Sequence, residues 1–164
     1  MLDRDDWKLA LEDARTRHAA VVNLIFFNDT QAMHLLRLYI PGAIACAAGA
    51  TASFGNSLFP IATSHSLIGA ALVLFVGSYF CYLAMAPATV NMPGRGADFW
   101  LWANEERVTR ENVFVTYLQT LKEKTAMNNG VNERGARALF HAKSAGIASP
   151  IIALVIGVIS FASK

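Results

Sequence analysis

The sequence predicts an all-α membrane protein in which about three transmembrane helices join cytosolic amphipathic helices to form a helical bundle. Three apolar runs support this prediction: 39–58, 66–88 and 144–161. The run 66–88 carries no charge and is long enough to cross the hydrocarbon of a bilayer as one helix. The composition agrees, because 54% of the 164 residues are hydrophobic and only 16% are charged, unlike a typical soluble domain.

We expect four segments along the chain. Residues 1–34 form a cytosolic amphipathic N-terminal helix, 35–90 a pair of transmembrane helices with a short external loop, 91–143 a cytosolic helical segment and 144–164 a C-terminal transmembrane helix. The front of the chain is acidic and lacks the basic flank and the early apolar core of a secretory signal. We therefore expect it to be retained.

The N-terminal segment carries an apolar stripe in which residues recur at alternating intervals of four and three: Trp7, Leu11, Ala14, His18, Val21 and Ile25. This spacing places them on one face of a helix. Such a seam needs an apolar partner, which is either the later cytosolic helix of the same chain or the same helix of another subunit. His18 and His34 are too far apart along a helix to share a metal ion, so we expect no metal site and no cofactor.

The first apolar run is rich in small residues. Ala45 and Gly49 form a pair four residues apart, and Gly42 lies on nearly the same face, which permits close approach of a second helix. That helix belongs either to the same chain or to another copy of it. The polar string 28–31, just before this run, either breaks the helix or faces a polar cavity.

The distribution of basic residues predicts the orientation of the spans. The stretch 55–65 contains no Lys or Arg, whereas basic residues precede the first span and separate the second span from the third. Because cytoplasmic loops carry an excess of Lys and Arg, we expect a cytoplasmic N-terminus and an external C-terminus.

The sequence lacks the signatures of several functional classes. It contains no G-x-x-x-x-G-K-[ST], H-E-x-x-H or G-x-S-x-G motif, so we expect no enzyme. No ionisable residue lies in the core of a predicted span, which argues against a proton-coupled transporter. The net charge of +2 without a dense basic cluster argues against a nucleic acid polymer as partner.

Two pairs of arginines in 91–143 are candidate ligand contacts. Arg107 and Arg110 are three residues apart, as are Arg134 and Arg137. Like charges at this spacing repel each other on a helix unless an acid or an anion lies between them. A small anionic ligand would serve, and so would solvent, lipid phosphates or neighbouring glutamates.

Aromatic residues open the same segment. Trp100 and Trp102 either stack on a nucleic-acid base or anchor at the bilayer surface. A second amphipathic helix follows around 114–125 and could cover the N-terminal stripe. The string 128–130 either breaks this helix or forms a polar turn within it.

The layout resembles the Pycsar transmembrane effectors, and a related layout occurs in the SLATT membrane effectors. The likeness rests on an N-D-x-Q-A-x-x-L-L string from Asn28 into the first span, a paired second span, the aromatic opening FWLW at 99–102 and a Leu-rich helix leading into a last span. The family more usually has A-D-x-K-A where this chain has N-D-T-Q-A. These effectors are small bacterial anti-phage proteins that sense a cyclic pyrimidine nucleotide and then impair the membrane.

The resemblance implies a homo-oligomeric effector of the bacterial inner membrane whose cytosolic helices sense a small anionic ligand, a cyclic nucleotide. The implied contacts are basic side chains for the phosphate, aromatic ones for the base and polar ones for the sugar or base edge: Arg107, Arg110, Arg134, Arg137, Trp100, Trp102, Asn28 and Asp29.

Two other hypotheses fit the residues. The chain could be an accessory subunit that docks its cytosolic helices on a larger membrane complex and binds no small molecule; the stripe at Leu11, Ala14, Val21 and Ile25 suits this equally well. It could also be a channel or holin-like pore lined by the small-residue face of the first span.

Overall fold

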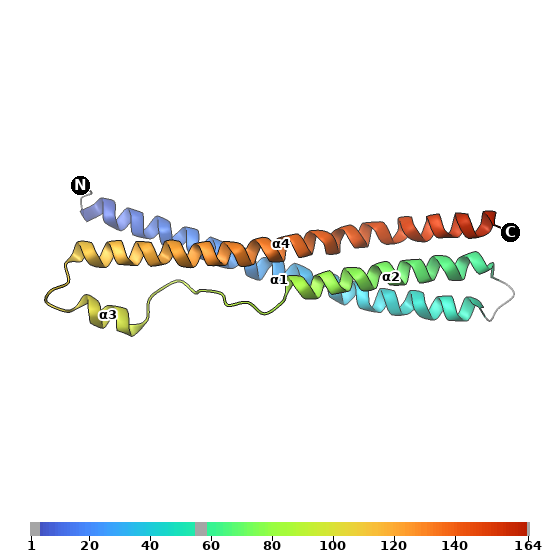
Figure 1. The fold of residues 1–164 in the computed structure, drawn as a ribbon, viewed down its shortest axis with the longest axis horizontal. Helices are drawn as coiled ribbons and strands as arrows, with labels where there is room; N and C mark the ends of the chain where they lie inside the picture. Colours follow the sequence, from blue (N-terminus) through green and yellow to red (C-terminus); the bar gives the residue numbers. More distant parts are fainter. Residues whose placement is uncertain (1–3, 55–58, 164) are drawn as a thin grey trace. The chain divides into compact units, whose positions relative to one another are not determined.

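The computed structural model describes residues 4–54 and 59–163, which form four α-helices (Figure 1). They are α1 (Arg4–Phe54), α2 (Ile61–Ala84), α3 (Ala97–Ala103) and α4 (Arg110–Ala162). The helical fold class is therefore confirmed, and α1, α2 and α4 are each long and apolar enough to cross a membrane. Residues 55–58 of the predicted external loop lie outside the described residues.

Both long helices continue through the two polar strings at which the sequence allowed either a break or a continuous helix. Residues 28–31 are helical within α1, and residues 128–130 are helical within α4. Most polar residues cost a helix less than about 0.7 kcal/mol each, and only Gly130 costs about 1 kcal/mol. These costs are small beside the packing of long helices. With 51 and 53 residues, α1 and α4 exceed the roughly 20 residues that a span needs.

The chain forms two compact units. Unit 1 contains the chain up to Phe27 together with 87–133, and unit 2 contains 28–86 and the chain from Arg134 onward. α3 thus belongs to unit 1, whereas α2 and the apolar parts of α1 and α4 belong to unit 2.

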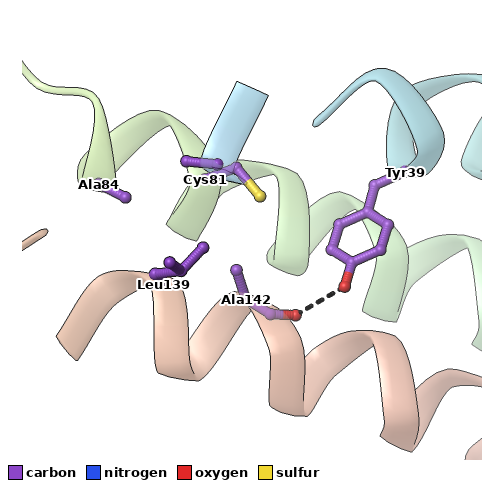
Figure 2. Close-up of a cluster of buried hydrophobic side chains, with 6 residues drawn as sticks. Tyr39, Cys81, Ala84, Leu139 and Ala142 are labelled. Carbon is purple, nitrogen blue, oxygen red and sulfur yellow. Dashed lines mark hydrogen bonds between the residues drawn. The ribbon is translucent and has the colours of Figure 1, made fainter. Parts of the chain in front are cut away.

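The core of unit 2 is built around Tyr39 of α1 (Figure 2). Its side chain is 8% exposed, and its hydroxyl donates a hydrogen bond of 3.0 Å to the carbonyl oxygen of Ala142 in α4. Cys81 from α2 and Leu139 from α4 complete this side of the cluster. One aromatic ring therefore contacts both partner helices.

Two glycines make room for this ring. A Cβ atom at Gly77 of α2 would lie 3.0 Å from the ring of Tyr39, and a Cβ atom at Gly146 of α4 would collide with its hydroxyl. Any larger residue at either position would displace Tyr39. Small residues thus let three helices approach one another around a large side chain.

The predicted small-residue face of α1 packs on α2 of the same chain. Cβ atoms at Gly42 and Gly49 would lie 3.4 and 3.2 Å from Leu74 and Leu67 of α2, respectively. Ala45, which we expected on this face, is exposed. It lies about 40–60° around the helix from the two glycines, given 100° per residue.

In unit 1 the N-terminal part of α1 packs along α4. All six residues of the predicted stripe are at least partly buried. Trp7 stacks on Phe114 with ring centroids 5.5 Å apart, and His18 hydrogen-bonds Thr125. At these positions the partner of the stripe is the later helix of the same chain.

Candidate functional site

Unit 1 contains a cavity of about 590 Å³ between the start of α1, α3 and the start of α4. This volume lies in the range of small-molecule sites. Its polar and aromatic lining consists of two basic residues, one amide and three aromatic rings: Lys8, Arg110, Asn104, Trp100, Phe114 and Tyr117. Aliphatic side chains complete the walls.

The wall formed by α4 is held in place from α1. Phe114 and Tyr117 lie three residues apart and therefore on one face of α4. Phe114 stacks on Trp7. Tyr117 is 3% exposed, and its hydroxyl accepts a 3.0 Å hydrogen bond from Nε of Arg15, whose guanidinium lies 5.0 Å from the ring centroid. Two residues of α1 thus fix the aromatic wall.

The wall formed by α3 is held by Arg95. Its guanidinium lies 4.4 Å from the ring centroid of Phe99 and 5.6 Å from that of Tyr117, and it donates a 3.1 Å hydrogen bond to the carbonyl oxygen of Thr116. Phe99 also packs edge-to-face on Tyr117 at 5.9 Å. These cation–π and aromatic contacts hold α3 against α4 and leave Trp100 half-exposed at the cavity.

The two basic side chains of the cavity are accessible to an anion. Lys8 pairs with Asp5 at 3.1 Å, but both side chains are largely exposed, so solvent screens the pair and an anion can replace Asp5. The side chain of Arg110 is exposed and makes no ion pair or hydrogen bond with the residues that the structure describes. α4 begins at Arg110, and the hydroxyl of Thr109 accepts a 3.3 Å bond from the Asn112 N–H, as a helix cap does.

Two cations beside the half-exposed ring of Trp100 fit a small ligand that carries both a planar ring and a negative charge. No protein-family model, curated protein or solved structure matches the chain. The function must therefore be inferred from the residues that line the cavity and from the long apolar helices.

Four predicted ligand residues lie in unit 1, and two of them line the cavity. These two are Arg110 and Trp100. Arg107 instead forms a surface ion pair with Glu105 at 2.9 Å. The ring of Trp102 packs against Phe99 at 5.4 Å, so it supports α3 from outside the lining.

The other four predicted ligand residues, Asn28, Asp29, Arg134 and Arg137, belong to unit 2. Asp29 lines a separate, shallow cavity of about 460 Å³ that also includes His34 and Arg37. Burial raises the pKa of the Asp29 carboxyl above its ordinary value of 3.8. Asn28, Arg134 and Arg137 each interact with other residues of the described chain.

The sequence alone did not identify several lining residues. Phe114 and Tyr117 follow Arg110 at intervals of four and three residues, and this spacing could have marked them as one face with Arg110. Lys8 gives no comparable signal, because it reaches the cavity through the pairing of two helices that are distant in sequence. Asn104 was not singled out either.

A second polar cluster in unit 1 surrounds His18, which is fully buried. Its Nδ1 lies 2.8 Å from Oγ1 of Thr125, and its Nε2 lies 2.8 Å from the carbonyl oxygen of Asn91. Hydrogen bonds therefore account for both ring nitrogens. Across residues 4–54 and 59–163, no group of three His, Cys, Asp or Glu side chains is placed to hold a metal ion.

Proposed function

We propose that the chain is a multi-pass effector of the bacterial inner membrane, with its N-terminus in the cytoplasm, that senses a cyclic nucleotide and then impairs membrane integrity in anti-phage defence. The cavity of unit 1 is the observation that carries the sensing role, because it combines Lys8 and Arg110 with the ring of Trp100. The resemblance to the Pycsar transmembrane effectors supports the defence role.

The phosphate and the base of a cyclic nucleotide each have a counterpart in this cavity. Lys8 and Arg110 offer two positive charges to the phosphate, which charge-assisted hydrogen bonds bind strongly. Trp100 is 50% exposed and so can stack on the base, a contact worth about 1–3 kcal/mol. The amide of Asn104 has both a donor and an acceptor for the base edge.

The membrane role is supported by the long helices of unit 2. In the most apolar stretch of α4 only 6% of the residues are buried. Large apolar side chains of this stretch are exposed: Ile147 to 70%, Leu154 to 68% and Phe161 to 72%. Lipid or another copy of the chain would cover such a surface, so we propose a homo-oligomer in which the ligand changes how the spans pack.

Calorimetric titration of the detergent-solubilised protein with cyclic UMP and cyclic CMP tests the sensing role. We expect one of them to bind, and we expect Arg110→Ala and Trp100→Ala each to weaken binding about tenfold or more, the loss typical of a charged or stacked contact. Arg17→Ala and Leu101→Ala, which alter exposed residues outside the lining, are the matched controls. Absence of binding by both nucleotides, or unchanged affinity in both cavity variants, would contradict the proposal.

The accessory-subunit hypothesis uses the stripe at Leu11, Ala14, Val21 and Ile25 as a docking surface. Within the chain these four residues are at least partly buried, and Trp7 and His18 of the same stripe contact α4, so this surface is already partly occupied. We therefore favour the effector over the accessory subunit.

A further inference from the structure

Asn91 lies in the irregular segment between the end of α2 at Ala84 and the start of α3 at Ala97, yet side chains bind both of its backbone polar groups. Its N–H donates a 2.9 Å hydrogen bond to Oδ1 of Asn128. Its carbonyl oxygen accepts bonds of 2.9 Å from Nδ2 of Asn128 and 2.8 Å from Nε2 of His18. The carboxamide of Asn128 thus pairs with the backbone of Asn91 as a neighbouring strand would.

The two side chains that bind Asn91 are fully buried. His18 and Asn128 are both 0% exposed. Because a carbonyl oxygen can only accept, Nε2 of His18 must carry a proton. On the other side of the ring, Nδ1 lies 2.8 Å from Thr125 Oγ1, and the single hydroxyl proton of Thr125 goes either to this nitrogen or to the carbonyl oxygen of Leu121, which lies 2.7 Å away. Nε2 of His18 and the carboxamide of Asn128 keep these partners only while Asn91 stays in place.

Between Asn91 and Arg95 the segment is held more loosely. The carbonyl oxygen of Gly94 accepts from Nζ of Lys124 at 3.3 Å, and this contact is exposed. Gly94 has a φ of 107°, which a side chain would disfavour, so the chain turns there before Arg95 reaches Thr116. Asn91 is therefore the residue at which buried side chains bind this segment, just before the turn into α3.

We propose that His18 and Asn128 form a latch on Asn91 that positions α3, and with it the Trp100 wall of the cavity. The latch opens as a unit, because removing either side chain leaves the others with buried polar groups unpaired. His18 and Asn128 are positioning residues and do not touch the ligand. Only the effect of the latch on ligand affinity rests on the proposed function.

Hydrogen exchange of the unaltered protein in detergent tests the latch without any ligand or substitution. We expect the peptide 87–96 to retain one strongly protected amide, that of Asn91, although the peptide forms no helix. Its exchange should be slowed by about a hundredfold or more, given the cost of exposing several buried polar groups together. Exchange of every amide at the rate of an open chain would overturn the latch.

Limited trypsin digestion at Arg95 tests the positioning of α3. We expect Asn128→Ala and His18→Ala to raise the rate of cleavage after Arg95 about tenfold, with His18→Gln closer to wild type because its amide can still donate to Asn91. Asn129→Ala and His34→Ala change neighbouring or exposed residues of the same types and serve as controls. Wild-type cleavage rates in folded latch variants would overturn the proposal; if the variants lose helical circular dichroism, the exchange measurement decides alone.

Binding of cyclic UMP or cyclic CMP then separates the latch from the proposed function. If wild type binds, we expect Asn128→Ala to weaken binding about fivefold or more, because α3 then keeps only the contacts of Arg95 and Phe99 and is less well positioned. Unchanged affinity in a variant that trypsin shows to be open would overturn the positioning role. If wild type binds neither nucleotide, the proposed function fails, and the exchange and digestion results still decide whether the latch exists.

Discussion

At the scale of single residues, Tyr39 shows how one polar atom fixes the core of unit 2. Its hydroxyl is buried against the carbonyl oxygen of Ala142, so Tyr39→Phe removes one hydrogen bond and leaves that oxygen with only its helical partner. We expect the free energy of unfolding to fall by about 1 kcal/mol. Thermal unfolding in detergent, followed by circular dichroism, measures this loss, with Tyr82→Phe (61% exposed) as the matched control.

A double-mutant cycle sharpens this prediction. Gly146→Ala places a methyl group against the Tyr39 hydroxyl and should cost about 1–3 kcal/mol by overpacking. Combined with Tyr39→Phe, the loss should be smaller than the sum, because the removed hydroxyl is the group that the methyl meets. Gly130→Ala, where no atom lies within 4 Å of the added Cβ, should not destabilise. Strict additivity would contradict the geometry.

Asp29 makes a prediction about pH. It lies outside the apolar run 39–58, and burial raises the pKa of its carboxyl. Ionisation of Asp29 is therefore harder in the folded state than in the unfolded state. The neutral carboxyl contributes its full stability to the folded state below pH 3.8, and this contribution is lost as the pH rises through the raised pKa. We expect Asp29→Asn to raise the unfolding temperature at neutral pH by about 1–2 °C and to have no such effect in acid. Asp13→Asn, on the exposed face of α1, is the control, and an equal gain at both pH values would contradict the assignment.

At the scale of elements, α3 is a short helix that depends on its contacts. Seven residues are too few to form a stable helix alone. The stability of α3 therefore depends strongly on the guanidinium of Arg95, which lies over the rings of Phe99 and Tyr117. We expect Arg95→Lys to loosen α3 despite the conserved charge, because an ammonium cannot stack as a plane. The measurement is a red shift of tryptophan emission from Trp100 and Trp102. Arg17→Lys, on the exposed face of α1, should leave the emission unchanged, and an unshifted spectrum in Arg95→Lys would contradict this role.

The helices were predictable because their signals are local. The stripe from Trp7 to Ile25 is visible in the spacing of neighbouring residues, and its burial confirms it. The continuity of α1 through 28–31 and of α4 through 128–130 was not predictable, because polar residues of low helix propensity permit either outcome. Tertiary contacts decide it: Asn128 is helical and pairs with Asn91, a residue in a different segment.

The candidate site was only partly predictable. Arg110 and Trp100 stand out by residue type, but Arg107, with the same type and a nearby position, pairs with Glu105 instead. Lys8 and Tyr117 reach the cavity through the packing of α1 on α4, and no spacing within either helix shows which residues meet. Sequence patterns report faces of helices, whereas the cavity depends on how two faces and α3 are aligned.

At the scale of the whole molecule, the predicted orientation can be tested by labelling. In a chain without Cys46 and Cys81, we expect Phe59→Cys to react with a membrane-impermeant maleimide on intact bacterial cells. Lys122→Cys should react only after the cells are made permeable, because charge bias places it in the cytoplasm. Both positions are exposed, so access to the reagent depends on the side of the membrane. The reverse pattern would contradict the orientation.

The position of Tyr39 between Gly77 and Gly146 also has a consequence for the proposed membrane function. A slide of α4 by about one turn would bring the side chain of Ala142 or Pro150 towards the place that Gly146 leaves empty, so the three long helices of unit 2 are held in a single register. In a bilayer the three helices should therefore move together as one rigid unit. Any leak would then form at the outer surface of this unit, against lipid or against another copy of the chain, and the packing between its three helices would stay closed.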